Sequence, residues 1–283
     1  MKKLLLIVSL FSVVTLSAQT VTKKISLVKG LQLEQQSQVN MNITQEMAGQ
    51  VIEVKMESNA TSLVEVKDDV ENGYAVSNTL KKVLMNVNGG GQEMKFDSDK
   101  KEDMDGQMGE PYRERIGKSK EYVVGKDGIV KEVKFEENKK DDANNMFGSM
   151  MSGSMADEKA GSNFNAFANL PAMGAKVGES WTDSTKEDGT SSVTMYTLKE
   201  VNGNDGVVSV ESDVTVSKEH EQQGMTMQME MKGKTTGEYV FDVATGIIKS
   251  RKATTKASGS VDVMNQLIPM TMESTLVSTV TKK

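Results

Sequence analysis

The chain has 283 residues, a net charge of −6, no cysteine and a single histidine. Without cysteine it can form no disulfide and carry no lipid on an N-terminal cysteine, and one histidine excludes a multi-histidine zinc site. An acidic chain with scattered basic residues is a poor partner for phosphate backbones, so we expect no nucleic acid as partner. The length suffices for one large β domain or two small ones.

The first 18 residues have the order of a secretory signal peptide. Lys2 and Lys3 precede an apolar run over residues 4–16, and small residues follow as far as Ala18. This run is too short for a comfortable transmembrane helix and is typical of a signal sequence, with an uncleaved anchor as the alternative. We predict a signal peptide over 1–18 and no transmembrane span in the mature chain. A periplasmic location is expected, with an extracellular one as the alternative.

Alternating apolar and polar residues predict antiparallel strands in the first half of the chain. Residues 39–44 alternate in this way, and the period of two resumes in residues 52–56 after a turn at 48–50. This is typical of a hairpin with one buried face. Asn72-Gly73 predicts a second hairpin with a type I′ turn, in which both central residues have positive φ. Asp127-Gly128 predicts a third hairpin.

The second half has the same kind of pattern. Asp205-Gly206 is predicted to join strands over residues 193–201 and 207–216, although Ser212 interrupts the apolar alternation. Thr245-Gly246 is predicted to join the next two strands. Two further strands are predicted at the end of the chain. In the last one, Met270 and Met272 lie on the same face.

The two halves also resemble each other in sequence. Glu-Tyr-Val-Val at residues 121–124 precedes Asp127-Gly128, and Glu-Tyr-Val-Phe at 238–241 precedes Thr245-Gly246, so the copies begin 117 residues apart. A period of this length indicates domain duplication rather than a solenoid. Chance likeness of two hairpins is the alternative.

We therefore predict an all-β fold made of two duplicated antiparallel β units, at residues 25–138 and 173–283. They are expected to form a curved sheet, a half-barrel or a sandwich. The segment between them, residues 139–172, lacks strand alternation, and its Met and Phe residues lie near helical spacing. It predicts a flexible, partly helical linker, in which Phe164 and Phe167 would act as lid contacts.

A short motif follows this linker. Leu170-Pro171, and then Val177-Gly178-Glu179-Ser180-Trp181, resembles the Leu-Pro … Val-Gly-Asp-Ser-Trp sequence of exported β-rich families of unknown function. In those families the motif opens the second of two β repeats, so the resemblance covers nearly the whole mature chain. It implies a β fold in the cell envelope, and it assigns no activity and no functional residue.

No catalytic residue is assigned from the sequence. His220 lies in a polar run, which predicts a solvated turn residue, and there is no Gly-x-Ser-x-Gly motif. Glycoside hydrolysis needs two carboxylates about 5–10 Å apart, and the sequence does not single out a pair. An enzyme acting on envelope glycans is therefore the weaker alternative.

The acidic stretch at residues 97–106 superficially resembles a calcium loop. Aligned on Gly106, an EF-hand would place Lys101 and Tyr112 at its first and last ligand positions, where carboxylates are required. We therefore expect a solvated acidic loop, no metal site and no cofactor, with an irregular, weak calcium site as the alternative.

Methionine is the unusual feature of the composition, with 21 methionines against seven phenylalanines and one tryptophan. Met225, Met227, Met229 and Met231 alternate with polar residues, so in a strand all four share one face. Leaving such side chains in water would forgo about 1.5–3 kcal/mol each. Something must cover this face.

Three kinds of group could cover the methionine face. The protein itself can cover the face, because methionine is an adaptable core residue, or an apolar ligand can. Copper(I) also binds thioethers, but alternate residues of a strand are about 6.6–6.8 Å apart, too far to share a metal. We predict a non-catalytic cell-envelope protein that binds a lipid or other hydrophobic ligand on these four methionines. The alternative is a protein-interaction or envelope-assembly module whose partner is another envelope protein.

Overall fold

The computed structural model describes residues 20–47, 49–134, 158–187, 189–222, 225–264 and 266–283. The predicted signal peptide and much of the predicted linker therefore lie outside the described residues. Most of the described chain forms one antiparallel sheet of 12 strands. In chain order these are β2 Gln32–Met47, β3 Gln50–Val70, β4 Gly73–Gly89, β5 Gln92–Asp97, β6 Ser119–Val124, β7 Val130–Val133, β9 Ser180–Glu187, β10 Thr190–Asn202, β11 Asp205–Gln222, β12 Met225–Asp242, β13 Ile248–Val263 and β14 Gln266–Lys282.

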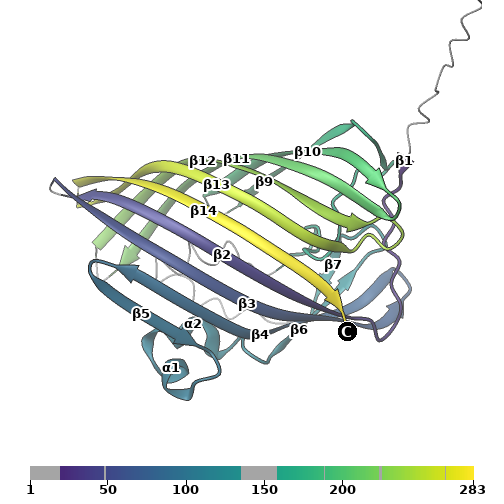
Figure 1. The fold of residues 1–283 in the computed structure, drawn as a ribbon, viewed down its shortest axis with the longest axis horizontal. Coiled ribbons are helices and arrows are strands. Elements are labelled where there is room, and N and C mark those ends of the chain that lie inside the picture. Colours follow the sequence, from purple (N-terminus) through teal and green to yellow (C-terminus); the bar gives the residue numbers. More distant parts are fainter. Residues whose placement is uncertain (1–19, 48, 135–157, 188, 223–224, 265) are drawn as a thin grey trace, which may run out of the picture.

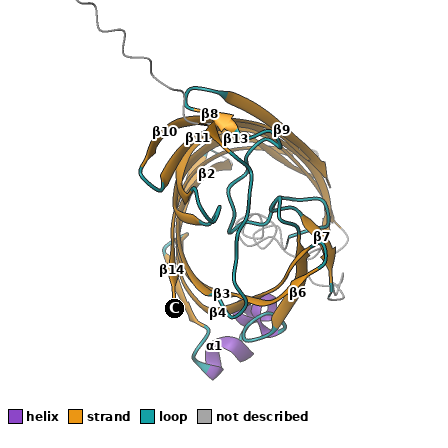
Figure 2. Ribbon diagram, turned by 90° about the vertical axis from the view of Figure 1, so that its right-hand side faces the viewer, coloured by secondary structure: helices purple, strands orange, loops and turns teal. Residues whose placement is uncertain are grey.

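The two halves of the chain form a single sheet because its first and last long strands pair. The strand order is β7-β6-β4-β3-β2-β14-β13-β12-β11-β10-β9, with β5 also on β4 (Figure 1). β14 lies antiparallel to β2, from Met270 opposite Gln45 to Lys282 opposite Leu33. Figure 2 shows this sheet curving around an interior that loop segments cross. The all-β prediction is confirmed, with a curved sheet rather than a sandwich; the duplication stays a prediction.

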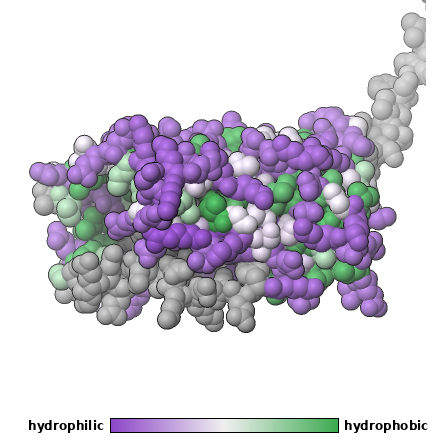
Figure 3. Space-filling view, turned by 90° about the horizontal axis from the view of Figure 1, so that it is seen from below, coloured by the Kyte–Doolittle hydropathy of each residue, from purple (hydrophilic) through white to green (hydrophobic). Residues whose placement is uncertain are grey.

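The strands keep a period of two over most of their length, as half-buried strands do. On β14, even-numbered residues from Met270 to Val280 are buried or half-buried, whereas the residues between them are mostly exposed. Figure 3 shows the result on one face, where hydrophilic side chains predominate and small hydrophobic areas lie between them. No helix in the described ranges is long and apolar enough to cross a membrane.

The hairpin predicted at Asn72-Gly73 forms, but its turn differs from the prediction. Val70 pairs with Gly73, so the turn residues are Glu71 and Asn72. Among the described non-glycine residues only Met264 has a positive φ, so the predicted type I′ turn is wrong. Gly73 itself has φ 150°, and a Cβ there would overlap the carbonyl oxygen of Val124 on β6. The close approach of β6 explains this glycine.

The turn predicted at Asp205-Gly206 is also displaced. Asn202 pairs with Asp205, which places the turn at Gly203 and Asn204 and leaves Gly206 inside β11. A Cβ on Gly206 would overlap the ring of Phe241. This glycine therefore makes room for an aromatic side chain instead of turning the chain.

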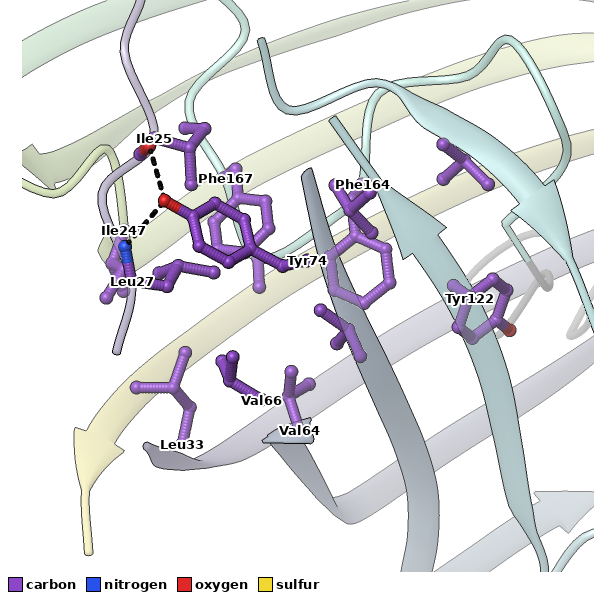
Figure 4. Close-up of a cluster of buried hydrophobic side chains, with 14 residues drawn as sticks. Ile25, Leu27, Leu33, Val64, Val66, Tyr74, Tyr122, Phe164, Phe167 and Ile247 are labelled. Carbon is purple, nitrogen blue, oxygen red and sulfur yellow. Dashed lines mark hydrogen bonds between the residues drawn. The ribbon is translucent and has the colours of Figure 1, made fainter. Parts of the chain in front are cut away.

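One end of the curved sheet is closed by an aromatic and aliphatic core. The N-terminal segment, including Ile25 and Leu27, lies across this end, as do Phe164 and Phe167 (Figure 4). The backbone of this segment binds both halves: Ile25 N donates to the carbonyl of Lys126 at 2.9 Å, and Ser26 N to that of Thr245 at 3.2 Å. It therefore ties together the two halves of the sheet.

The hydroxyl of Tyr74 fixes this segment from within. It accepts a hydrogen bond from the backbone N–H of Leu27 and donates one to the carbonyl of Ile25, both at 3.3 Å (Figure 4). Tyr74→Phe should lower the free energy of unfolding by about 1–2 kcal/mol, because two buried backbone groups lose a partner. Urea unfolding would measure the change. Tyr196→Phe is the control, because Tyr196 is half-buried and stacks on Trp181 through its ring, which phenylalanine keeps; equal effects would contradict the prediction.

The acidic stretch predicted as a solvated loop, residues 97–106, contains one short helix, and two more follow it. They are α1 Lys101–Asp105, η1 Gln107–Gly109 and α2 Glu110–Arg113, between β5 and β6. Tyr112 is buried and stacks on Phe96 of β5, with ring centroids 5.1 Å apart. The loop prediction is wrong for residues 101–105, because Met104 packs against the buried cluster, but Glu102 and Asp105 are exposed as predicted. The described part of the predicted linker, residues 158–172, consists of turns and isolated bridges.

Candidate functional site

The predicted methionine face lies on the buried side of the curved sheet. Met229 and Met231 of β12 are buried, and Met227 is half-buried beside them. The backbone of Met225 begins β12, but its side chain lies outside the described residues. Three of the four predicted methionines thus share a face that the protein itself covers in part.

Other methionines converge on this face from strands distant in sequence. Met229 and Met231 share one buried cluster with four further buried methionines from β2, β3, β4 and β14. We call these six residues the methionine cluster: Met41, Met56, Met85, Met229, Met231 and Met270. Gln45 Nε2 donates to Met270 Sδ at 3.4 Å, across 225 residues of sequence. Tyr112 and Phe96 pack at the edge of the cluster.

Phe164 and Phe167 lie elsewhere. Both are buried in the core at the closed end of the sheet, where Phe164 lies 5.5 Å from Tyr122 and 5.4 Å from Phe167 between ring centroids. Neither belongs to the hydrophobic group around the methionine cluster. The structure therefore does not bring the two predicted lid residues to the predicted methionines.

A polar cavity of about 240 Å³ lies between the methionine cluster and the aromatic end. Its wall combines basic, amide and hydroxyl side chains with a few aliphatic ones. The basic residues of this wall are Arg115, Lys118, Lys120 and Arg251, and the carboxylate among its described residues is Glu158. Polar side chains are unusual in the interior of a sheet, and here they lie between two apolar clusters.

Arg251 is a half-buried basic group that the sheet itself contributes to this wall. It lies on β13, where its guanidinium donates to the carbonyl of Asn165 at 3.4 Å and lies 6.0 Å from the ring centroid of Tyr239. Within the described ranges no carboxylate forms an ion pair with it. Burial lowers its pKa, because desolvation disfavours the charged form, while Tyr239 and Tyr196 act in the opposite direction.

Hydroxyl groups line the floor of the cavity between the basic residues. Arg251 pairs across the sheet with Ser278 of β14, and Ser278 with Ser37 of β2. Ser58 of β3, 2% exposed, also lines the cavity, and its Oγ has no hydrogen-bond partner in the described structure. Buried hydroxyls normally have partners, so this one is available to a bound group.

These residues were missed from the sequence, although a signal for them is present. Ser37, Ser58 and Ser278 occur at positions where the apolar parity of β2, β3 and β14 would place an aliphatic residue. A polar residue on the buried parity of several long strands indicates an interior polar site. Arg251 has no such signal, because its strand is short of apolar residues.

The remaining sequence predictions bear on metal and acid–base chemistry. His220 lies in β11 opposite Met227, so the predicted turn position is wrong for its backbone; its side chain lies outside the described residues. β11 extends to Gln222 because each of its residues pairs with a residue of β12. Within the described residues, no group of three or more His, Asp or Glu is placed to hold a metal ion.

A solved structure has a fold similar to that of this chain. A lipovitellin structure, "Lipid-protein interactions in lipovitellin", is similar over 90% of this chain, with a TM-score of 0.51 and 10% identity. The match covers 25% of that protein, so this chain spans about a quarter of its length. An outer membrane channel from Pseudomonas putida F1 matches 91% of this chain and 98% of its own at 8% identity, but its TM-score of 0.27 is too low to indicate a shared fold.

Comparisons of sequence place the chain in a family. No curated protein matches it. A family model described as "Family of unknown function (DUF6263)" matches residues 71–248, more than half of the chain. The expected likeness to a family of unknown function is thus confirmed at that level, while the motif and the repeat stay predictions. The chain belongs to the DUF6263 family of unknown function.

Proposed function

We propose that this protein binds a lipid or other hydrophobic molecule, without catalysis, on the inner face of its curved sheet. The observation that carries this proposal is the methionine cluster, in which six buried methionines from five strands meet. Methionine is unbranched and polarizable, so such a surface repacks readily around apolar chains of different shape. An aliphatic or aromatic core of fixed shape would serve stability better.

The fold likeness supports the same proposal. The lipovitellin structure is described by its lipid–protein interactions, and the likeness covers nearly all of this chain. At 10% identity it concerns the fold, and it brings across no residue. We also propose a periplasmic location, which rests on the signal-like sequence at residues 1–18.

The described cavity offers little support for the glycan-acting alternative. Its described wall includes Glu158 as the carboxylate, whereas glycoside hydrolysis uses a pair about 5–10 Å apart. A single carboxylate among several basic groups is better suited to binding an anion than to acid–base work on a sugar.

Native mass spectrometry of the protein purified gently from its own membrane fraction would test the proposal. We expect a stoichiometric lipid that leaves on denaturation and that is identified by its mass. The double variant Met227→Gln, Met229→Gln should lose most of this ligand, because polar amides replace thioethers on the inner face. A mass equal to the bare chain, with no uptake from mixed lipid vesicles, would contradict the proposal.

Two controls separate loss of binding from loss of folding. Met195→Gln changes a methionine that is exposed on β10 and should leave ligand content unchanged. Replacing Met227 and Met229 by leucine keeps the face apolar at similar volume, so it should retain the ligand. Circular dichroism would confirm that each variant keeps its strands.

The protein-interaction module remains the second candidate function, favoured by one surface feature. The tips of the neighbouring hairpins β2–β3 and β13–β14 carry four exposed apolar residues: Met47, Val51, Met264 and Leu267. Exposed apolar groups that lie together mark contact surfaces. A bare chain in the mass measurement, together with a crosslinked envelope protein lost on changing Leu267 to Ser, would favour this function.

A further inference from the structure

The described wall of the polar cavity contains more basic groups than carboxylates. Four basic residues and one carboxylate line its described wall, and this wall lies between two apolar clusters. Lys118 forms an ion pair with Glu114, and Arg115, Lys120 and Glu158 also have partners in the protein. Arg251 is different, because its polar contacts are a carbonyl oxygen and the face of a tyrosine ring.

Arg251 is half-buried, so its guanidinium is partly desolvated, and within the described residues no carboxylate offsets its charge. Desolvating a charge is costly unless an opposite charge and full hydrogen bonding compensate for it, and one carbonyl at 3.4 Å compensates poorly. A guanidinium has five N–H donors in a planar fork, which fits a carboxylate or phosphate in a bidentate way. The residue thus has the geometry of a site for an anion.

The hydroxyl groups beside Arg251 point to the same kind of ligand. Ser278 pairs with Arg251 in the sheet, and Ser58 on β3 is buried with an unpartnered Oγ at the same cavity. A hydroxyl can donate to an acidic oxygen, as the guanidinium does. These donors come from three strands, so the site is built by the sheet and not by one flexible loop.

The cavity adjoins the methionine cluster. Ala60 and Leu80 line the cavity and also pack against the hydrophobic group that holds the cluster. The volume of about 240 Å³ is below the range of about 300–1,000 Å³ that holds a drug-sized ligand. It suits a head group better than a whole lipid.

We propose that this cavity binds the acidic head group, a carboxylate or phosphate, of an amphipathic lipid whose apolar chain lies against the methionine cluster. This inference rests on the proposed function and adds the charge class of the ligand. Arg251 is the principal anion contact, and Ser58 supplies a hydrogen bond. The apolar chain extends from the Ala60 and Leu80 side of the cavity.

Calorimetry with three probes would test the inference: dodecanoate, dodecan-1-ol of the same chain length, and inorganic phosphate. We expect dodecanoate to bind at least about tenfold more tightly than the alcohol, because a charged hydrogen-bonded contact exceeds a neutral one. Arg251→Gln should abolish that difference while leaving the affinity for the alcohol unchanged. Lys252→Gln is the matched control, since it removes the same charge from the neighbouring exposed position and should change nothing.

A stability measurement separates a binding role of Arg251 from a structural one. If Arg251 serves the ligand, Arg251→Gln without ligand should unfold at the same or a higher urea concentration, because a half-buried charge that no carboxylate offsets is removed. If the variant instead unfolds earlier and loses affinity for both dodecyl compounds together, Arg251 is a structural residue and the inference is wrong.

The other outcomes distinguish this inference from the proposed function. Equal affinity for dodecanoate and dodecanol in the unchanged protein would overturn the head-group site and leave lipid binding standing. Binding of phosphate through Arg251, with neither dodecyl compound bound, would mean that a free anion occupies the cavity and would overturn both. Absence of binding by all three probes would also overturn both.

Discussion

Phe164→Ala is expected to lower the free energy of unfolding by about 3–5 kcal/mol, the range for removing a fully buried phenylalanine. Phe164 is 0% exposed and packs on Tyr122 and Phe167 at the closed end of the sheet. Its backbone N–H also donates to the carbonyl of Gly128 at 2.9 Å, which keeps the segment in place and prevents it from collapsing into the space left. The cost should therefore lie in the upper part of the range.

Urea unfolding followed by circular dichroism would measure this change. Met173→Ala is the control from the same part of the chain, because Met173 is 91% exposed and surface substitutions change stability by about 0.5 kcal/mol or less. A loss below about 1 kcal/mol for Phe164→Ala would show that this segment is not part of the core. It would then be free to act as the lid that the sequence predicted.

Gly259→Val should also destabilise the protein strongly, by about 2 kcal/mol or more. Gly259 of β13 lies between Met231 of β12 and Met270 of β14 in the sheet register. A Cβ there would overlap the carbonyl oxygen of Glu230. The obstacle is backbone, so a change of rotamer cannot relieve it, and the strands must separate next to the methionine cluster.

The intrinsic preference of valine for strands acts in the opposite direction but is smaller, within a scale of about 1 kcal/mol. Ser258→Val provides the matched control, because Ser258 is the next residue of the same strand and is exposed. Thermal unfolding should show a large decrease for Gly259→Val and little change for Ser258→Val. Equal melting temperatures for the two variants would contradict the close approach of β12 and β13.

The methionine cluster and the polar cavity distinguish the inner face of this sheet from an ordinary aliphatic core. An aliphatic interior would be more stable than one that half-buries Arg251 and leaves the Oγ of Ser58 without a partner within the described residues. Features that cost stability are expected where a protein binds something. The proposed lipid, with an apolar chain and an acidic head, accounts for both features at once.

Local sequence patterns determined the strands and the face that each buries. A period of two follows from strand geometry alone, so the pattern in β2 and β14 and the methionine alternation in β12 predicted which side chains are buried. The sequence pattern predicted the positions of the turns less accurately than those of the strands. At Asn72-Gly73 and Asp205-Gly206, contacts with Val124 and Phe241, far along the chain, explain the glycines.

Only the tertiary structure decided how the two halves meet. The pairing of β2 with β14 joins residues more than 200 positions apart, and no local pattern specifies that partner. The same pairing brings Ser37 beside Ser278, and through it Arg251, to form a cavity that no single strand contains. Alternation specifies the face of a strand, whereas its neighbours depend on long-range packing, so the methionine face was predictable and the polar cavity was not.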